Sequence, residues 1–148
     1  MKKYSFFMFI LILNLFSQDF KTDKNLVSGT LKNGLKYYIY PNKKPQNFIS
    51  ARIEVKTGSL NEEKNEEGLA HFIEHMAFNG TKKYPKNDLI KILESKGVGF
   101  GNDLNAYTSF DKTVYMLDGQ TKDLDDFLDI LHEWAFNVTF DKNETEKE

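Results

Sequence analysis

The chain contains no cysteine in its 148 residues. This absence excludes a disulfide framework and any metal site built on thiolates. A bound metal ion would therefore have to be held by histidine, aspartate or glutamate side chains. Histidine is also scarce, with 3 in the chain, so the place of each one carries information.

Neither sign of charge dominates, because 20 lysine and arginine residues face 22 aspartate and glutamate residues. The net charge of −2 is spread along the chain, without a basic field or an acidic block. We therefore expect no nucleic-acid partner and no solvating acidic tail. A hydrophobic content of 40% over this length suits one modest globular domain.

Long hydrophobic runs are missing from the chain except for one short run near its start. Lys2 and Lys3 precede residues 6–16, which are apolar apart from Asn14, whereas a membrane-spanning helix needs about 20 apolar residues. This pattern predicts a signal peptide over residues 1–17 and an exported protein, periplasmic or extracellular, with no stable membrane span after signal removal. A buried N-terminal helix or a short membrane anchor is the alternative.

Residues 25–148 contain no internal repeat, low-complexity tract or proline-rich linker, and we interpret them as one domain. Asn33-Gly34 predicts a two-residue hairpin turn of type I′, in which both central positions need positive φ. Residues 48–57 alternate between apolar and polar side chains, which predicts a half-buried strand. The other expected elements are helices over 69–78, 85–96 and 122–138 and a strand over 106–117.

The ends of these helices have recognisable signals. Pro85 suits the first turn of the second helix. Asp141 and Glu144 have the spacing of a capping box, so a further helix is expected to start there. Because the strands and helices do not strictly alternate, the order of elements favours an α+β fold over a doubly wound parallel sheet.

Two of the three histidines fall in the motif His71-x-x-Glu74-His75. On a helix, positions i and i+4 lie on one face, so His71 and His75 can direct their imidazole nitrogens at one metal ion. Zn²⁺ accepts neutral imidazole, and a catalytic zinc ion activates a water molecule whose proton a nearby carboxylate can take. Glu74 is placed for this role of general base. The alternatives are a surface triad or buried histidines with satisfied hydrogen bonds.

A catalytic zinc ion usually has three protein ligands, and the motif supplies two of them. The spacing leaves the third ligand open among Asp103, Asp111, Glu144, Glu146 and Glu148. The third histidine, His132, is isolated beside the apolar stripe of its helix, and we interpret it as structural.

Three stretches of the chain resemble the pitrilysin/insulysin/mitochondrial processing peptidase family of inverzincin zinc metallopeptidases. They are residues 68–81 (GLAHFIEHMAFNGT), 105–115 (NAYTSFDKTVY) and 134–141 (WAFNVTFD). The resemblance extends over roughly residues 25–148. With the predicted signal peptide, the chain is most similar to bacterial exported zinc proteases of this family.

The resemblance implies an α+β domain in which helices flank an antiparallel sheet, as in the N-terminal domain of these enzymes. It implies zinc bound by His71 and His75, with Glu74 as the general base. It also implies that the strand containing Asn105, Ala106 and Thr108 pairs with the substrate backbone, a mode in which an extended peptide adds to a sheet edge.

One departure from the family concerns the third ligand. The family has this ligand on the helix that begins near Asp141, and Glu148 resembles a supporting glutamate that precedes it. Glu148 is therefore expected either to hold one of the metal ligands by a hydrogen bond without binding the metal itself, or to substitute for the missing third ligand. On this reading the domain is truncated shortly before its third ligand.

The sequence as a whole favours the N-terminal part of a zinc-dependent metalloendopeptidase, weakly active or inactive alone. Its partners would be a peptide or protein substrate and the remaining domains of a full-length protease, or a partner subunit. The alternative is a non-catalytic remnant or peptide-binding domain with a degenerate metal site. A purely structural exported domain is a third possibility.

Overall fold

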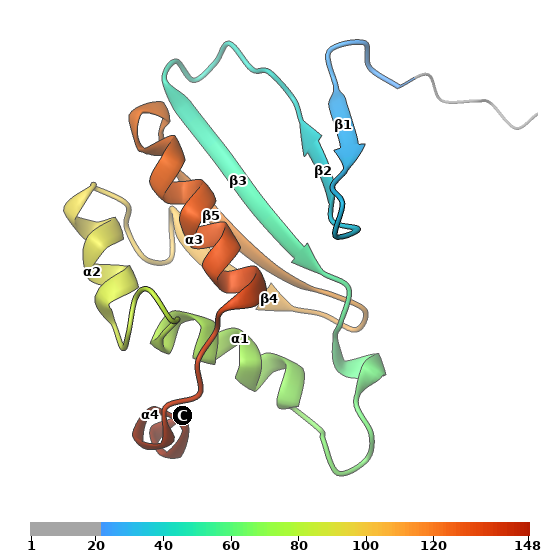
Figure 1. The fold of residues 1–148 in the computed structure, drawn as a ribbon, viewed down its shortest axis with the longest axis vertical. Helices are drawn as coiled ribbons and strands as arrows, with labels where there is room; N and C mark the ends of the chain where they lie inside the picture. Colours follow the sequence, from blue (N-terminus) through green and yellow to red (C-terminus); the bar gives the residue numbers. More distant parts are fainter. Residues whose placement is uncertain (1–21) are drawn as a thin grey trace, which may run out of the picture. The chain divides into compact units, whose positions relative to one another are not determined.

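A computed structural model describes residues 22–148 (Figure 1). The predicted signal peptide over residues 1–17 lies outside the described residues. Within the described part, no helix has the length and apolar content needed to cross a membrane. The chain divides into two compact units, one ending at Asn42 and the other spanning Lys43–Glu148.

The described part of the first unit, residues 22–42, contains an antiparallel hairpin of β1 (Val27–Thr30) and β2 (Lys36–Ile39). The hairpin was expected, but the predicted type I′ turn is wrong, because only Gly34 in this turn has positive φ (88°). The Gly34 N–H donates to the Leu31 carbonyl at 2.9 Å, and the Leu31 N–H donates to the Leu35 carbonyl at 2.8 Å. This is the three-residue loop in which one left-handed glycine completes the turn.

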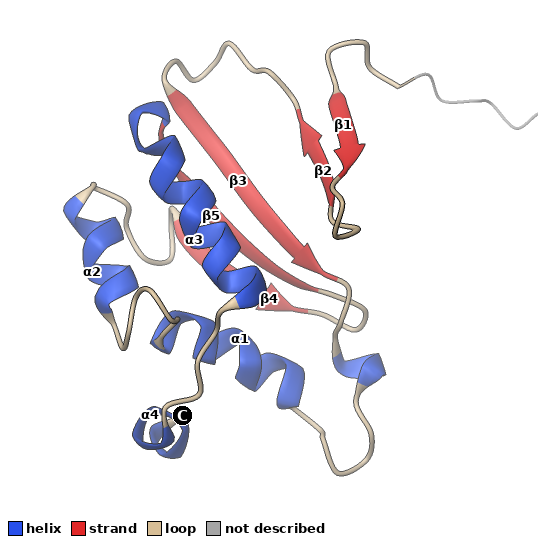
Figure 2. Ribbon diagram, viewed as in Figure 1, coloured by secondary structure: helices blue, strands red, loops and turns tan. Residues whose placement is uncertain are grey.

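The second unit is built on a three-stranded antiparallel sheet with the order β3-β5-β4 (Figure 2). Its strands are β3 (Phe48–Val55), β4 (Leu104–Thr108) and β5 (Thr113–Gln120). The single strand expected over residues 106–117 is wrong, because the chain reverses there and the Ser109 N–H donates to the Lys112 carbonyl at 2.8 Å. Ser109 and Asp111 are turn-forming residues, but strand-favouring residues on both sides concealed the turn.

Four helices accompany this sheet: α1 (Leu69–Asn79), α2 (Asp88–Ser95), α3 (Leu124–Phe136) and α4 (Lys142–Lys147). Two 3-10 turns, η1 (Ser59–Asn61) and η2 (Thr121–Asp123), precede α1 and α3. Together with the two antiparallel sheets, these helices confirm the α+β class, and α1 and α3 agree with the predicted ranges to within about two residues.

The starts of α2 and α4 differ from the expectations. Helix α2 does not begin at Pro85, because Lys86 has a positive φ of 55° that interrupts the helix, and it begins only after Asn87. Asp141 does cap α4, with its carboxylate accepting from the backbone N–H groups of residues 143 and 144 at 3.0 and 3.3 Å. The Glu144 carboxylate accepts from Lys147 (2.9 Å), so the reciprocal half of the expected capping box is not formed.

The core of the second unit lies where α3 packs across one face of the sheet (Figure 1). Leu117 on β5 and Phe127 and Ile130 on α3 are fully buried there. Trp134 on α3 stacks on Tyr115 with ring centroids 5.4 Å apart and an interplanar angle of 26°. Its indole N–H donates to the Ala77 carbonyl at 3.2 Å, so one side chain connects α3, β5 and α1.

Glu133 is a buried carboxylate that fastens the connection following α1 to the end of α3. It is 5% exposed and accepts from the Lys83 N–H at 2.9 Å and from the Asn137 side chain at 2.6 Å. Burial disfavours its charge, but hydrogen bonds from Lys83, Thr81 and Asn137 outweigh burial and hold the pKa of Glu133 below its usual value. The ionised carboxylate therefore contributes stability in the folded state.

We expect Glu133→Gln to destabilise the chain by about 1–3 kcal/mol at neutral pH, because an amide cannot accept all of these hydrogen bonds. A carboxylate whose pKa is lower in the folded state than in the unfolded state, where it is about 4.3, stabilises the fold at pH values above the unfolded pKa. This contribution to stability is lost as the pH falls through the folded pKa. Urea unfolding at pH 7 and near pH 3 should therefore show a difference between wild type and variant that shrinks in acid. The exposed Glu94→Gln is the control, and a difference that did not change with pH would contradict the assignment.

Candidate metal centre

Helix α1 brings His71, Glu74 and His75 together on one face. One donor atom from each residue lies within 4.8 Å of the others, and they are the one such group among the described residues. The Nε2 atoms of the two imidazoles are 3.1 Å apart. Two nitrogens bound to one tetrahedral zinc ion at about 2.05 Å would be about 3.3 Å apart. The spacing of the imidazoles therefore fits a shared metal ion.

The start of α1 is fixed by a residue outside the motif. Glu62 accepts hydrogen bonds from the Gly68 N–H at 2.9 Å and the Ala70 N–H at 2.8 Å. These bonds lower the pKa of Glu62 and satisfy N–H groups that a helix start leaves without partners. Gly68, with φ of 90°, lets the chain turn into the helix directly before the motif.

Glu74 lies on the protein side of this group. It is 6% exposed, and its Oε2 accepts a hydrogen bond of 2.6 Å from the Thr108 hydroxyl on β4. Burial, followed by the charge of Glu74, raises the pKa of the neighbouring Tyr115 to about 12. Tyr115 therefore stays neutral beside the carboxylate at physiological pH.

Glu148 contacts His75 on the side of the ring that faces away from His71. Its Oε1 is paired with His75 Nδ1, and its Oε2 accepts from the Asn79 side chain at 3.0 Å. These hydrogen bonds, first that of His75 and then that of Asn79, lower the pKa of Glu148. The carboxylate therefore lies behind the ring, and Nε2 is left pointing toward His71.

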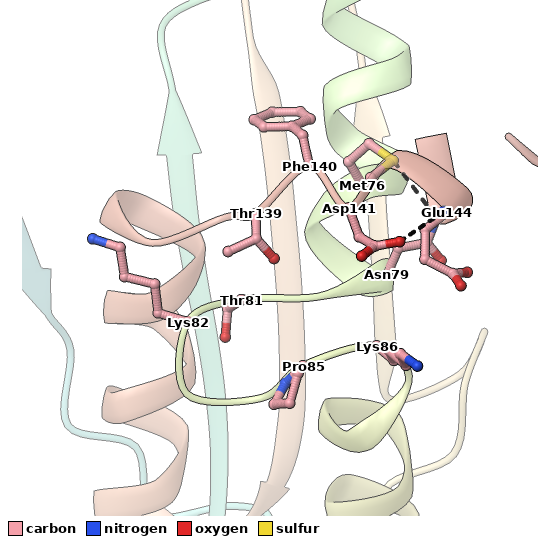
Figure 3. Close-up of a pocket in the computed structure, with 10 residues that line it drawn as sticks. All are labelled: Met76, Asn79, Thr81, Lys82, Pro85, Lys86, Thr139, Phe140, Asp141 and Glu144. Atoms are coloured by element: carbon pink, nitrogen blue, oxygen red, sulfur yellow. Dashed lines mark hydrogen bonds between the residues drawn. The ribbon is translucent and has the colours of Figure 1, made fainter. Parts of the chain in front are cut away.

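The other acidic residues and the third histidine are not members of this group of donor atoms. The Asp103 carboxylate accepts from the Gly99 N–H at 3.0 Å, Glu144 pairs with Lys147, and His132 is exposed beside Glu133. Neither these residues nor Asp111, Glu146 and Glu148 belong to the described group of donor atoms. A nearby pocket at the end of α1, whose lining includes Asn79, Lys86, Asp141 and Glu144, also contains none of its three members (Figure 3).

Among the strands of the described residues, β4 pairs only with β5, so its other edge is free from Ala106 onward, whereas Leu104 is bridged to Phe100. The hydrogen bond from Ser109 to Lys112 fixes which residues face that edge. Antiparallel pairs alternate, so residues 105 and 107 bond to β5 and the backbone N–H and C=O of Ala106 and Thr108 point outward. The Asn105 side chain accepts from the Ala106 N–H at 2.9 Å.

Comparison with known proteins identifies the class to which this arrangement belongs. The family model for insulinase (peptidase family M16) matches residues 37–148. The Escherichia coli protein named probable zinc protease PqqL is 46% identical over 129 residues, covering 85% of this chain and 14% of that protein. The chloroplastic stromal processing peptidase of Arabidopsis thaliana is 44% identical over 127 residues, covering 81% and 9%.

A solved structure gives the same answer. The periplasmic protease PqqL from Escherichia coli matches with a TM-score of 0.81 and 46% sequence identity, over 84% of this chain and 14% of that one. The chain therefore belongs to the insulinase family of peptidases, M16, which confirms the resemblance, and its fold matches the N-terminal domain of PqqL. It spans 14% of the length of PqqL and 9% of that of the stromal processing peptidase.

Sequence reasoning missed the contacts that hold the candidate centre from outside. No local pattern indicated the contacts of Glu62, Asn79 and Gly58, because these contacts are defined only by the fold. Gly58 lies directly before two residues that bond to the turn after β4. The Ser59 N–H donates to the Ser109 carbonyl at 3.1 Å, and the Leu60 N–H donates to the Phe110 carbonyl at 2.8 Å. These bonds fasten the segment before α1 to the turn that ends β4.

We expect Gly58→Ala to destabilise the chain by about 1–3 kcal/mol, as for other overpacked sites. A Cβ at this position would overlap the Ser109 carbonyl oxygen and lie 2.7 Å from the Phe110 carbonyl carbon, both rigid backbone atoms. Chemical denaturation measures the loss. Gly99→Ala is the control, because its Cβ would come no closer than 3.5 Å to the Asp103 carboxylate; equal losses in both variants would refute the steric cause.

Proposed function

We propose that this chain forms the zinc-binding part of a metalloendopeptidase, an enzyme that hydrolyses peptide bonds with a zinc-activated water molecule. The observation that carries the proposal is the pair of imidazole Nε2 atoms 3.1 Å apart with the Glu74 carboxylate beside them. His71 and His75 would hold the zinc ion, which lowers the pKa of bound water and polarises the scissile carbonyl. The family membership and the names of the relatives support the same class of reaction.

Glu74 is proposed as the general base of this reaction. One of its oxygens is already engaged by Thr108, which leaves the other to accept a proton from the water molecule. A general base must lie close to the proton that it removes. The Glu74 carboxylate meets this requirement because it belongs to the group of donor atoms that would surround the metal ion.

Glu148 is proposed to support His75 rather than to bind the metal ion. Histidine ligands commonly donate their second N–H to a carboxylate, which fixes the tautomer and the orientation of the ring. The contact of Glu148 with Nδ1 fits that role, since the ligand atom would be Nε2.

The outward edge of β4 is proposed to bind the substrate as an added strand. Ala106 and Thr108 direct backbone N–H and C=O groups there, and an extended peptide can pair with such an edge once it displaces the Asn105 side chain from the Ala106 N–H. The hydrogen bond from Thr108 to Glu74 connects this edge to the metal centre through one side chain. A bound peptide would therefore run beside the catalytic groups.

The 148-residue chain alone is proposed to bind zinc weakly and to cleave little. Its described donor group has two imidazoles and a base, and a third ligand and the opposing wall would come from further domains or a partner subunit. The length of the relatives supports this view. The relative solved as a periplasmic protease supports export, in agreement with the predicted signal peptide.

We expect zinc titration of the chain by calorimetry to show one site that His71→Ala and His75→Ala abolish. His132→Ala is the matched control and should bind as the wild type does, because this histidine lies outside the group. Glu148→Gln should weaken zinc binding by about 10–100-fold, as loss of such a supporting carboxylate does. Zinc affinity unaffected by either motif histidine would refute the site.

We expect Ala106→Pro to weaken binding of an extended peptide to the chain without changing its zinc affinity. Proline removes an outward N–H of β4 but none that pairs with β5, so the sheet itself is retained. Fluorescence anisotropy of a labelled peptide measures the binding, with the N–H-retaining Ala106→Gly as control. Equal peptide affinity in both variants would exclude pairing at this edge.

If a quenched peptide is cleaved and Glu74→Gln abolishes cleavage, the chain is more active alone than proposed here. Peptide binding without cleavage or zinc binding would instead favour a non-catalytic peptide-binding domain.

A further inference from the structure

Three oxygen atoms form a row that leads from the end of β3 to the Glu74 carboxylate. The Thr113 hydroxyl donates to the Thr57 carbonyl at 3.0 Å, the hydroxyls of Thr108 and Thr113 are 3.2 Å apart, and the Thr108 hydroxyl donates to Glu74 at 2.6 Å. Thr113 is 5% exposed, Glu74 is 6% exposed and Thr108 is partly buried, so the access of water to this row is restricted. The row lies behind the carboxylate, on the side of the sheet.

The direction of these hydrogen bonds follows from counting hydrogens. Each hydroxyl carries one hydrogen, and that of Thr113 goes to the Thr57 carbonyl. The hydrogen of Thr108 then has two acceptors, Glu74 at 2.6 Å and Thr113 at 3.2 Å. A carboxylate at this distance accepts a short, charge-assisted bond and is the stronger acceptor, so the hydrogen belongs to the bond with Glu74.

Building on the proposed function, we propose that Thr108 is a positioning residue for the general base. Its hydroxyl holds Oε2 of Glu74 against β4 and thereby keeps Oε1 directed toward the reacting water. Among the described side chains, Thr108 is the hydrogen-bond donor to this carboxylate. Without it, the carboxylate would lose its partner in a poorly hydrated place and would adopt other rotamers.

Thr108 can hold this position because of its place on β4. Its β-branched side chain is restricted at χ1 in a strand, and its partner in the register is Thr113, which is buried. The backbone of Thr108 lies on the free edge at the same time. Pairing of a peptide with that edge therefore orders the residue that orients the base, which couples substrate binding to the geometry of Glu74.

The test uses NMR of the zinc-free 148-residue chain with labelled glutamate and threonine. Three-bond couplings of Glu74 should report a single χ1 rotamer in the wild type and in Thr108→Ser, which keeps the hydroxyl. Thr108→Val keeps the shape but removes the donor, and it should give averaged couplings. A single unchanged rotamer in Thr108→Val would overturn the proposal.

Thr113→Val is the matched control, because it removes the neighbouring buried hydroxyl but not the one that contacts Glu74. It should retain the single rotamer, and averaging equal to that of Thr108→Val would assign the effect to sheet packing and overturn the proposal. Should Thr108→Val not fold, the wild type decides. A slowly exchanging Thr108 hydroxyl proton with a nuclear Overhauser effect to Glu74 supports the proposal, and its absence overturns it.

This experiment is independent of the proposed function. Zinc titration of the same wild-type chain, with the metal alone, tests whether His71 and His75 bind zinc. A chain that binds no zinc but holds Glu74 through Thr108 would refute the zinc assignment alone. A chain that binds zinc at these histidines while the Glu74 side chain samples several χ1 rotamers would refute the positioning role alone.

Discussion

Helix α1 has to satisfy two environments at once, and the rest of the second unit is arranged around this constraint. One face of the helix buries Ala77 and Phe78 in the core. The other face presents two exposed imidazoles whose Nε2 atoms are close together. Polar rings of this kind are costly to bury without partners, so this face has to remain outside the core. Glu74 lies at the border between the two faces, where it is buried but still within reach of the imidazoles. The helix is therefore held from several directions.

The contacts that hold α1 come from outside the helix, and two of the three come from distant parts of the chain. Glu62 binds its first turn, Trp134 donates to the carbonyl of Ala77, and the Thr108 hydroxyl binds Glu74. The bonds of Trp134 and Thr108 satisfy polar groups that are buried or partly buried and would otherwise lose water without compensation. Such contacts matter for catalysis because groups that act together need fixed mutual geometry, and helices and strands provide it better than loops. The candidate centre is thus a property of the unit rather than of the motif alone.

The local part of this arrangement could be predicted from sequence, and the long-range part could not. The spacing of His71, Glu74 and His75 depends on helix geometry alone, so the pattern of residues sufficed to bring them together. The turn at Ser109 was missed because strand-favouring residues surround it, and the start of α2 was misplaced because Lys86 adopts a left-handed conformation that lysine seldom takes. The partners of Glu62 and Thr108 depend on how β3, β4 and α1 meet, which no local pattern contains.

Glu148 illustrates how geometry decides between roles that a sequence leaves open. A glutamate near two histidines can bind a metal ion or support one of its ligands, and residue spacing is the same in both cases. The two roles differ in which imidazole nitrogen the carboxylate meets, and here it meets Nδ1 of His75 while Nε2 faces His71. Asn79 holds the second oxygen of the same carboxylate, so a swing of Glu148 toward the Nε2 side would break two interactions at once. A ring restrained in this way needs little reordering when a metal ion binds, which favours a supporting role for Glu148.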